Sequence, residues 1–492
     1  MTPPETAYDN IGQLKTAQGV ESAYDVNTGQ NTNAPRLNEQ FGYAYDKAWN
    51  LLERTNNALV ETFNVNDLNE LSSQTNSGTL TVAGTATERN GNAPYDNNPG
   101  VTNVTVNGDE AYLYGDGTFA APGFTPVNGL HTYTAIGQDN IGRLSTNSVS
   151  VNLPGTNNFS YDLNGNLLSD GTRNFGYDDE NQLISVWVAS AWSNSFAYDG
   201  LMRKRIELDY SWQGGSWVET NEVYFVYDGN LVIQERYINL QLPTQTLLDS
   251  ITYTRGVDLS GTLQGAGGIG GLLARTDMGA LIAGNSQASA YYLSDARGNV
   301  VGMVNTNGFQ VASYKYDPFG NMIAMSGPLA AANRYRFSSK EWSDNAGLYY
   351  YGYRFYDPML QRWINRDPIL EWGGVNLYEY VANAPLYWLD LFGLDEKTGP
   401  PLPPSVPPTV IIGDPYPTLP PPINPTPTQS PPFLPPTKTP IHITLPVLQL
   451  PAPFPPGCTM SYGLPPGFDG PPGSYESPPG PTISGPLPPW KG

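Results

Sequence analysis

The chain is poor in the residues on which many enzymes and metal sites depend. Its 492 residues include one cysteine, Cys458, and two histidines, His131 and His442. A single cysteine excludes an internal disulfide, and these three side chains cannot build a thiolate and imidazole zinc site. A Ser-His-Asp or Cys-His triad is disfavoured for the same reason. We therefore expect no metal and no cofactor, and any chemistry must use carboxylates or hydroxyls.

Positive charge and long apolar runs are also scarce. The chain has 24 Lys and Arg against 45 Asp and Glu, which gives a net charge of -21. Nucleic acids and anionic lipids require clustered cations, so we expect neither as a partner. There is no run of 18 apolar residues, and the first residues lack the basic and apolar regions of a signal peptide. The sequence thus predicts no transmembrane segment and no signal peptide in this chain.

Proline is rare in most of the chain and concentrated at one end. Of the 47 prolines, 33 lie in residues 400–492. Proline fixes φ and removes a backbone donor, which favours an extended polyproline II chain over a sheet or a helix. We predict a disordered, Pro-rich variable tail over residues 395–492. We expect this tail to act as a semi-rigid spacer or, alternatively, as a Pro-rich recognition ligand.

The body of the chain carries a Tyr-Asp repeat. The tyrosine spacings 8 to 24 to 45 and 161 to 177 to 198 are both 16 and then 21 residues, which indicates a repeated structural unit. One unit has the pattern of a hairpin. Residues 222–227 are predicted to form a strand, Asp228-Gly229-Asn230 a turn, and residues 231–237 the return strand. A ladder of such hairpins predicts one long antiparallel sheet. The Tyr-Asp pair occurs at Tyr8, Tyr24, Tyr45, Tyr161, Tyr177, Tyr198, Tyr227, Tyr316 and Tyr356.

Residues 77–156 interrupt the repeats and have another character. Short alternating strands are expected at residues 80–87, 101–106 and 148–152, with Asn-Gly and Asp-Gly turns between them. About 80 residues of this pattern suit a small sandwich. The segment resembles bacterial immunoglobulin-like modules, and we predict an inserted sandwich.

Two loops match ligand-binding motifs by their letters alone. Asp162 to Asn166 copies the opening of a calcium loop, but the required glycine and acidic residue are replaced by Leu167 and Arg173. Residues 265–270, Gly-Ala-Gly-Gly-Ile-Gly, match a dinucleotide fingerprint without the β-α-β context that it requires. We interpret the first as a repeat turn and the second as a structural Gly-rich segment.

The aromatic run at residues 348–358 and the charged residues after it are the most informative stretch. The rings could form a sugar-binding platform, although packing in a core or sheet is favoured. Asp367 and Asp390 lie just before the Pro-rich tail, with Arg354 upstream. Two carboxylates held together cannot both ionise, so such a pair can act as general acid and base on a peptide bond. The alternative is two turn aspartates that cap strands.

Residues 8–62 and 157–394 resemble RHS/YD-repeat proteins, the relatives of the teneurin YD shell and of the C component of Tc toxins. The resemblance rests on motifs of the RHS repeat-associated core. These are Tyr-Asp-Pro-Phe-Gly-Asn at 316–321, Arg-Asp-Pro-Ile at 366–369, Gly-Gly-Val-Asn-Leu-Tyr at 373–378 and Asp-Leu-Phe-Gly-Leu at 390–394.

The resemblance implies an all-β fold: a YD-repeat antiparallel β-strip that spirals into a partial shell, closed at its end by the core. The predicted domains are residues 1–76 and 157–290 for the strip, 77–156 for the immunoglobulin-like insert, 291–394 for the core and 395–492 for the tail. After removal of insert and tail, about 315 residues remain, fewer than a sealed shell would need. A companion shell component or the upstream part of a longer RHS chain is therefore expected as a partner.

In the toxin members of the family an aspartyl autoprotease cuts after the terminal Gly-Leu and frees a variable effector. The resemblance places the catalytic pair on Asp367 and Asp390, the supporting arginine on Arg354, and the cleaved bond between Leu394 and Asp395. Leu391 stands where the common motif has proline.

The predicted function is that of a structural shell protein in a bacterial polymorphic-toxin or cell-surface system, secreted or displayed at the surface. It would be at most a self-cleaving aspartyl peptidase. The alternative is an adhesion protein that binds cell-surface glycans or proteins and does not cleave itself.

Overall fold

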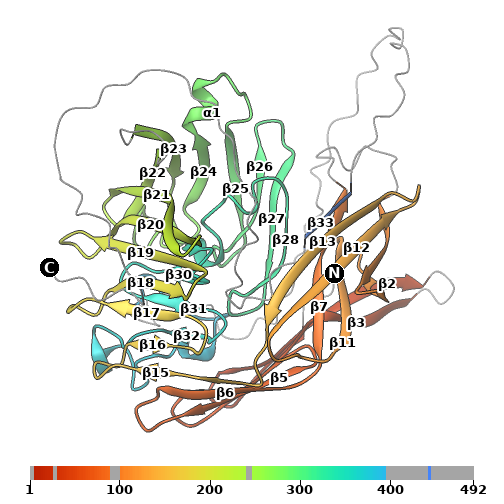
Figure 1. Ribbon diagram of the computed structural model, residues 1–492, viewed down its shortest axis with the longest axis horizontal. Coiled ribbons are helices and arrows are strands. Elements are labelled where there is room, and N and C mark those ends of the chain that lie inside the picture. The colour runs from red at the N-terminus through yellow and green to blue at the C-terminus, as the bar shows by residue number, and fades with distance from the viewer. Residues whose placement is uncertain (1–4, 26–29, 89–99, 240–245, 395–440, 445–492) are drawn as a thin grey trace.

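The computed structural model describes residues 5–25, 30–88, 100–239, 246–394 and 441–444, and it is built almost entirely of antiparallel strands (Figure 1). The predicted all-β fold class is confirmed. The helical elements are short: α1 (Met278–Ile282) and the 3-10 turns η1 (Phe337–Ser339), η2 (Leu370–Trp372) and η3 (Val381–Asn383). Within the described ranges, no helix has the length and apolar character that a membrane crossing requires.

The YD-repeat strip is divided between two sheets, so the expectation of one long sheet is wrong. The first contains, in order, β1 (Glu5–Tyr8), β2 (Leu14–Asp25), β3 (Gln30–Tyr45), β4 (Leu51–Asn56), β5 (Leu59–Val65), β6 (Leu71–Gly78) and β14 (Thr156–Asn158). The break follows from the chain path, because the chain leaves the strip after β6, returns as β14 beside β6, and then starts a new sheet.

The second sheet has fourteen strands in sequence order and forms a curved wall in Figure 1. Its strands are β15 (Ser160–Tyr161), β16 (Leu167–Ser169), β17 (Asn174–Tyr177), β18 (Leu183–Val188), β19 (Trp192–Tyr198), β20 (Lys204–Gln213), β21 (Ser216–Asp228), β22 (Leu231–Asn239), β23 (Thr246–Arg255), β24 (Leu272–Asp277), β25 (Ser289–Ser294), β26 (Val300–Asn305), β27 (Gln310–Tyr316) and β28 (Met322–Ser326).

Most Tyr-Asp units form the same turn. In the turn after β19, Asp199 Oδ1 accepts the backbone N–H groups two and four residues later, at 2.9 and 3.2 Å. The strand register shifts at the preceding tyrosine, Tyr198. Asp46, Asp178 and Asp317 accept hydrogen bonds at the same two offsets. An aspartate can satisfy a tight turn in this way without help from distant residues, so the repeat encodes its own hairpins.

Residues of the predicted insert lie in two four-stranded sheets that enclose a separate apolar cluster around Phe119, Tyr133 and Val104. One sheet has the order β10 (Tyr112–Leu113), β11 (Thr118–Phe124), β7 (Leu80–Glu88) and β33 (Ile441–Thr444). The other has the order β13 (Leu144–Asn152), β12 (Leu130–Asp139), β8 (Val101–Val106) and β9 (Asp109–Glu110). Asp116 ties these sheets to the strip through Arg36 at 2.9 Å and Lys315 at 2.8 Å.

β33 belongs to the Pro-rich tail, so the prediction that the tail builds no sheet is wrong at residues 441–444. This segment pairs antiparallel with β7 (Figure 1). It is free of proline and contains three β-branched residues, Ile441, Ile443 and Thr444, which suits a strand. The other residues of the tail lie outside the described residues.

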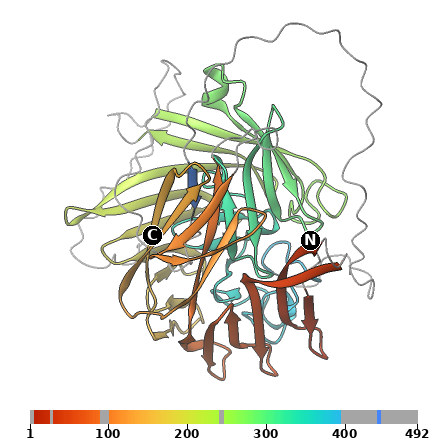
Figure 2. The same cartoon turned by 90° about the vertical axis from the view of Figure 1, so that its right-hand side faces the viewer.

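The region after β28 fills the space between the two sheets of the strip. It contains the small sheet β29 (Glu341–Ser343), β30 (Leu348–Tyr350), β31 (Phe355–Asp357) and β32 (Arg362–Trp363). Its rings pack in one apolar cluster with residues of both sheets, such as Phe41 of β3 and Phe196 of β19. In Figure 2 this cyan region lies behind and above the dark red strands of the first sheet. The largest core of the molecule therefore joins sequence-distant segments.

Candidate functional site

The aromatic run at residues 348–358 is buried. Tyr349, Tyr351 and Tyr356 are at most 2% exposed, and only Tyr353 of its rings has substantial exposure. Tyr356 stacks on Tyr380 with ring centroids 3.9 Å apart. These rings provide the packing around the candidate site and offer no sugar-binding platform.

Arg354 lies between β30 and β31. One nitrogen of its guanidinium lies close to both candidate carboxylates. Its Nη2 donates to Asp367 Oδ2 at 2.6 Å and lies 3.9 Å from Asp390 Oδ2. The three side chains are between 2 and 7% exposed. The guanidinium also lies over the ring of Trp363, 4.3 Å from its centroid. The structure thus brings together Arg354, Asp367 and Asp390, the three residues that the sequence analysis selected.

Burial changes the protonation of this group. It raises the pKa of Asp367 to about 6, with Arg354 opposing the shift and Asp390 adding to it. Burial also raises the pKa of Asp390, again opposed by Arg354. The pKa of Arg354 is lowered to about 10, mainly by its own burial. Burial therefore lets both carboxyls keep a proton to a higher pH than free aspartate does, while Arg354 favours their ionised forms.

Asp390 shapes the loop that leads to the predicted cleavage point. Its Oδ1 accepts the N–H groups of Phe392, Gly393 and Leu394, at 3.0, 2.6 and 3.2 Å. Gly393 has φ +80°, and a Cβ on it would lie 3.2 to 3.3 Å from atoms of Arg354 and Tyr351. Glycine satisfies both the left-handed backbone and the close approach, which explains its place in the Asp-Leu-Phe-Gly-Leu motif.

Asp367 is held by its own turn and by the carbonyl of Leu377. Its Oδ1 accepts the N–H of Ile369 at 2.9 Å, and its backbone N–H donates to Leu377 O at 3.0 Å. The same carbonyl accepts Arg354 Nη1 at 3.1 Å. Both aspartates therefore cap turns, as the alternative interpretation held, and they also share a buried arginine.

The carbonyl of Leu394 lies beside Asp367. A Cβ built on Gly373 would lie 2.6 Å from Asp367 Oδ2 and 3.0 Å from Leu394 O, so both oxygens border the same small space. Asp395, the other residue of the predicted cleavage point, lies outside the described residues. The sequence did not indicate that Gly373 borders this space, because the only sign of it is the close packing of Asp367 and Leu394 around the glycine in the folded structure.

The two motif-like loops have structural roles. Asp162 Oδ1 accepts the N–H groups of Asn164 and Asn166, as in the other repeat turns. Residues 265–270 form turns between β23 and β24, so the glycines lead into a strand and not into a helix. No group of three or more metal-ligating side chains is found among the residues that the structure describes.

Sequence comparison finds relatives that share parts of the chain, although no family model matches it. YibJ of Escherichia coli (strain K12) is 35% identical over 103 residues, 21% of this chain and 44% of that protein. Toxin subunit YenC2 of Yersinia entomophaga is 38% identical over 102 residues, 18% of this chain and 10% of its own length. The double-stranded DNA deaminase toxin A of Burkholderia cenocepacia (strain H111) is 29% identical over 248 residues, 48% of this chain and 17% of that toxin.

The chain thus spans less than half the length of each of these relatives. Superposition on the solved complex TcdB2-TccC3 covers 80% of this chain and 20% of that one, at 17% identity and a TM-score of 0.40, too low to support an inference. The sequence matches to the toxin subunits confirm the resemblance that the Tyr-Asp repeats and core motifs indicated. The chain is therefore a relative of the RHS and Tc toxin proteins.

Proposed function

We propose that this chain is a shell component of a toxin system and that its core cuts the chain after Leu394, freeing residues 395–492. The observation that supports the proposal is the buried contact of Arg354 with both Asp367 and Asp390, next to the loop that contains Leu394. The toxin subunits among its relatives support the shell role.

The proposed reaction is hydrolysis of the Leu394–Asp395 peptide bond. The ionised carboxylate takes a proton from water while the water oxygen attacks the Leu394 carbonyl carbon. The protonated carboxyl gives its proton to the Asp395 nitrogen as the bond breaks. Arg354 holds the two carboxyls in place, and its positive charge offsets the negative charge of the ionised carboxylate. Hydrolysis by carboxyls alone agrees with the shortage of histidine and cysteine.

The test is the mass of the chain after synthesis without added metal. The wild type is expected to yield two fragments that meet at Leu394–Asp395. Asp367→Asn and Asp390→Asn keep the side-chain shape and remove the titrating group, so each is expected to leave the chain whole. Arg354→Lys is expected to slow cleavage, because an ammonium cannot reproduce the planar hold of a guanidinium.

Asp317→Asn is the matched control. Asp317 is also a buried turn aspartate, and burial raises its pKa to about 6, but it lies at the turn after β27. This variant is expected to cleave like the wild type. Cleavage that persists in both Asp367→Asn and Asp390→Asn would overturn the proposal and leave the two aspartates as turn caps.

We also propose that a companion component or a longer chain continues the strip beyond β1. Among the described strands, β1 pairs with β2 alone, which leaves one edge available for pairing. The toxin subunits, of which this chain matches only a tenth, are consistent with a larger assembly.

A further inference from the structure

The loop that carries Asp390 is held at three successive carbonyls by three residues from two segments. Lys340 Nζ donates to Leu391 O at 2.5 Å, the Tyr353 N–H donates to Phe392 O at 3.1 Å, and Arg354 Nε donates to Gly393 O. Tyr353 and Arg354 belong to the turn that already contributes to the site. Lys340 comes from elsewhere, from the residue before β29, and the proposed function gives it no role.

The Gly-rich segment at residues 265–270 completes this hold. Asp258 Oδ2 fixes its shape by accepting the N–H groups of Ala266 and Gly268, at 2.7 and 3.1 Å. Gly267 O accepts a second hydrogen bond from Lys340 Nζ at 3.2 Å. Because a Cβ on Gly267 would lie 2.2 Å from Leu391 O, only glycine permits this contact. The segment that resembled a dinucleotide loop thus packs against the loop that carries Asp390.

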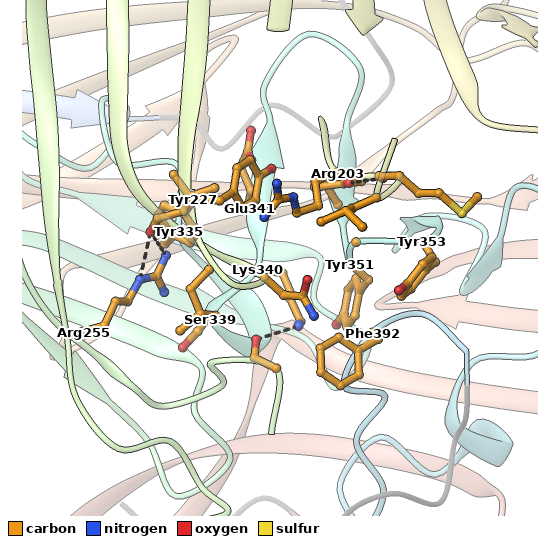
Figure 3. A pocket seen from close by; sticks show the side chains of 18 residues that line it. Arg203, Tyr227, Arg255, Tyr335, Ser339, Lys340, Glu341, Tyr351, Tyr353 and Phe392 are labelled. Carbon is orange, nitrogen blue, oxygen red and sulfur yellow. Dashed lines mark hydrogen bonds between the residues drawn. The ribbon is translucent and has the colours of Figure 1, made fainter. Parts of the chain in front are cut away.

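Apolar packing supports the same contact. Ala266 and Ile269 of the Gly-rich segment form a small buried cluster with Leu391, and Phe392 packs against it. A cavity of about 70 Å³ lies beside the cluster, and Lys340, Tyr351 and Phe392 line it. Figure 3 shows Lys340 between Ser339 and Tyr351, with its nitrogen directed toward a backbone carbonyl.

Lys340 is a buried cation with an uncommon environment. Its two hydrogen-bond acceptors are backbone carbonyls, and no ion pair within 4.0 Å is found for it among the described residues. The charged groups that act on it are Asp390, Arg255 and Asp258. Burial lowers the pKa of Lys340 to about 7, and Asp390 opposes that shift. A charge on Lys340 must in turn favour the ionised form of Asp390, because the interaction is mutual.

We propose that Lys340, held by the Gly-rich segment, is a positioning residue for self-cleavage: it fixes the Leu391 carbonyl and favours the ionised carboxylate of Asp390. This inference rests on the proposed function, since it concerns the same reaction. Lys340 does not touch the bond between Leu394 and Asp395 and acts through Asp390.

The first test is the self-cleavage rate of Lys340→Met as a function of pH. Methionine keeps much of the length of the side chain and removes the charge and both hydrogen bonds. We expect cleavage at least tenfold slower than in the wild type. We also expect the alkaline limb of the rate profile to move to higher pH by about half a unit or more. The reason is that, without the positive charge of Lys340, the carboxyl pair keeps its proton up to a higher pH. A general loss of packing would lower the rate without moving that limb.

The second test is a pair of glycine variants, which can test the proposal even if Lys340→Met does not fold. Gly267 and Gly261 both have positive φ, +58° and +76°, and both lie between β23 and β24. A Cβ at Gly261 meets nothing within 4 Å, whereas at Gly267 it would strike the Leu391 carbonyl. Gly261→Ala is therefore expected to cleave like the wild type, and Gly267→Ala at least tenfold more slowly.

The outcomes separate this inference from the proposed function. A wild type that never cleaves would refute the proposed function itself. If the wild type cleaves and Lys340→Met has the same rate, or a lower rate with an unmoved alkaline limb, the positioning role is wrong. Equal rates for Gly267→Ala and Gly261→Ala would likewise overturn it.

Discussion

Gly373→Ala should block self-cleavage by crowding. Gly373 has φ -81° and ψ -21°, a conformation that alanine adopts freely, so the substitution adds no backbone strain. The new Cβ would lie 2.6 Å from Asp367 Oδ2 and 3.0 Å from Leu394 O. An ordinary contact starts near 3.4 Å, so the carboxylate oxygen must move by about 0.8 Å. This oxygen is also the one that accepts Arg354 Nη2 at 2.6 Å.

The displacement sets the expected magnitude. A shift of about 1 Å in a reacting group can cost on the order of 100-fold in rate, and we expect a loss of that size. The cost to folding should be about 1–3 kcal/mol, which is typical of adding one methyl group to a packed site.

The assay is pulse-labelled cell-free synthesis, followed by the time course of the fragment that starts at residue 395. Gly200→Ala is the control, because a Cβ there meets nothing within 4 Å and Gly200 has no positive φ. Wild-type cleavage rates in Gly373→Ala, with the protein folded, would show that this space is not where the reaction takes place.

Two further predictions concern stability. Burial raises the pKa of Asp317 and of Asp367 to about 6 each, so the folded chain binds more protons than the unfolded chain between about pH 4 and 6. The melting temperature should therefore be higher at pH 5 than at pH 7, and Asp317→Asn should reduce that difference; an unchanged difference would contradict the assignment. Lys204→Met removes the buried partner of Glu207 and Glu341, at 2.7 and 2.6 Å, and should cost about 3–5 kcal/mol in denaturant unfolding. Lys315→Met, whose side chain is 30% exposed, should cost at most about 1 kcal/mol, and equal losses in the two variants would refute this reasoning.

The sequence by itself determined the local structure. The hairpin predicted from residues 222–237 is formed by β21 and β22. The strands expected near 80–87, 101–106 and 148–152 are present as β7, β8 and the end of β13. These features could be predicted because a turn such as that of Asp199 is satisfied by hydrogen bonds within five residues. Arg354, Asp367 and Asp390 could be selected because their motifs are specific, although no spacing rule places them together.

Only the tertiary structure decided how these pieces meet. It separates the strip into two sheets at β14 and buries the aromatic run between them. It brings Arg354 to both aspartates, and it sets Gly267 against Leu391 and Lys340. Nothing near Lys340 in the sequence distinguishes it from a surface lysine. Such contacts depend on how a curved sheet wraps its contents, and the burial that raises the pKa of Asp367 exists only once the distant segments have packed.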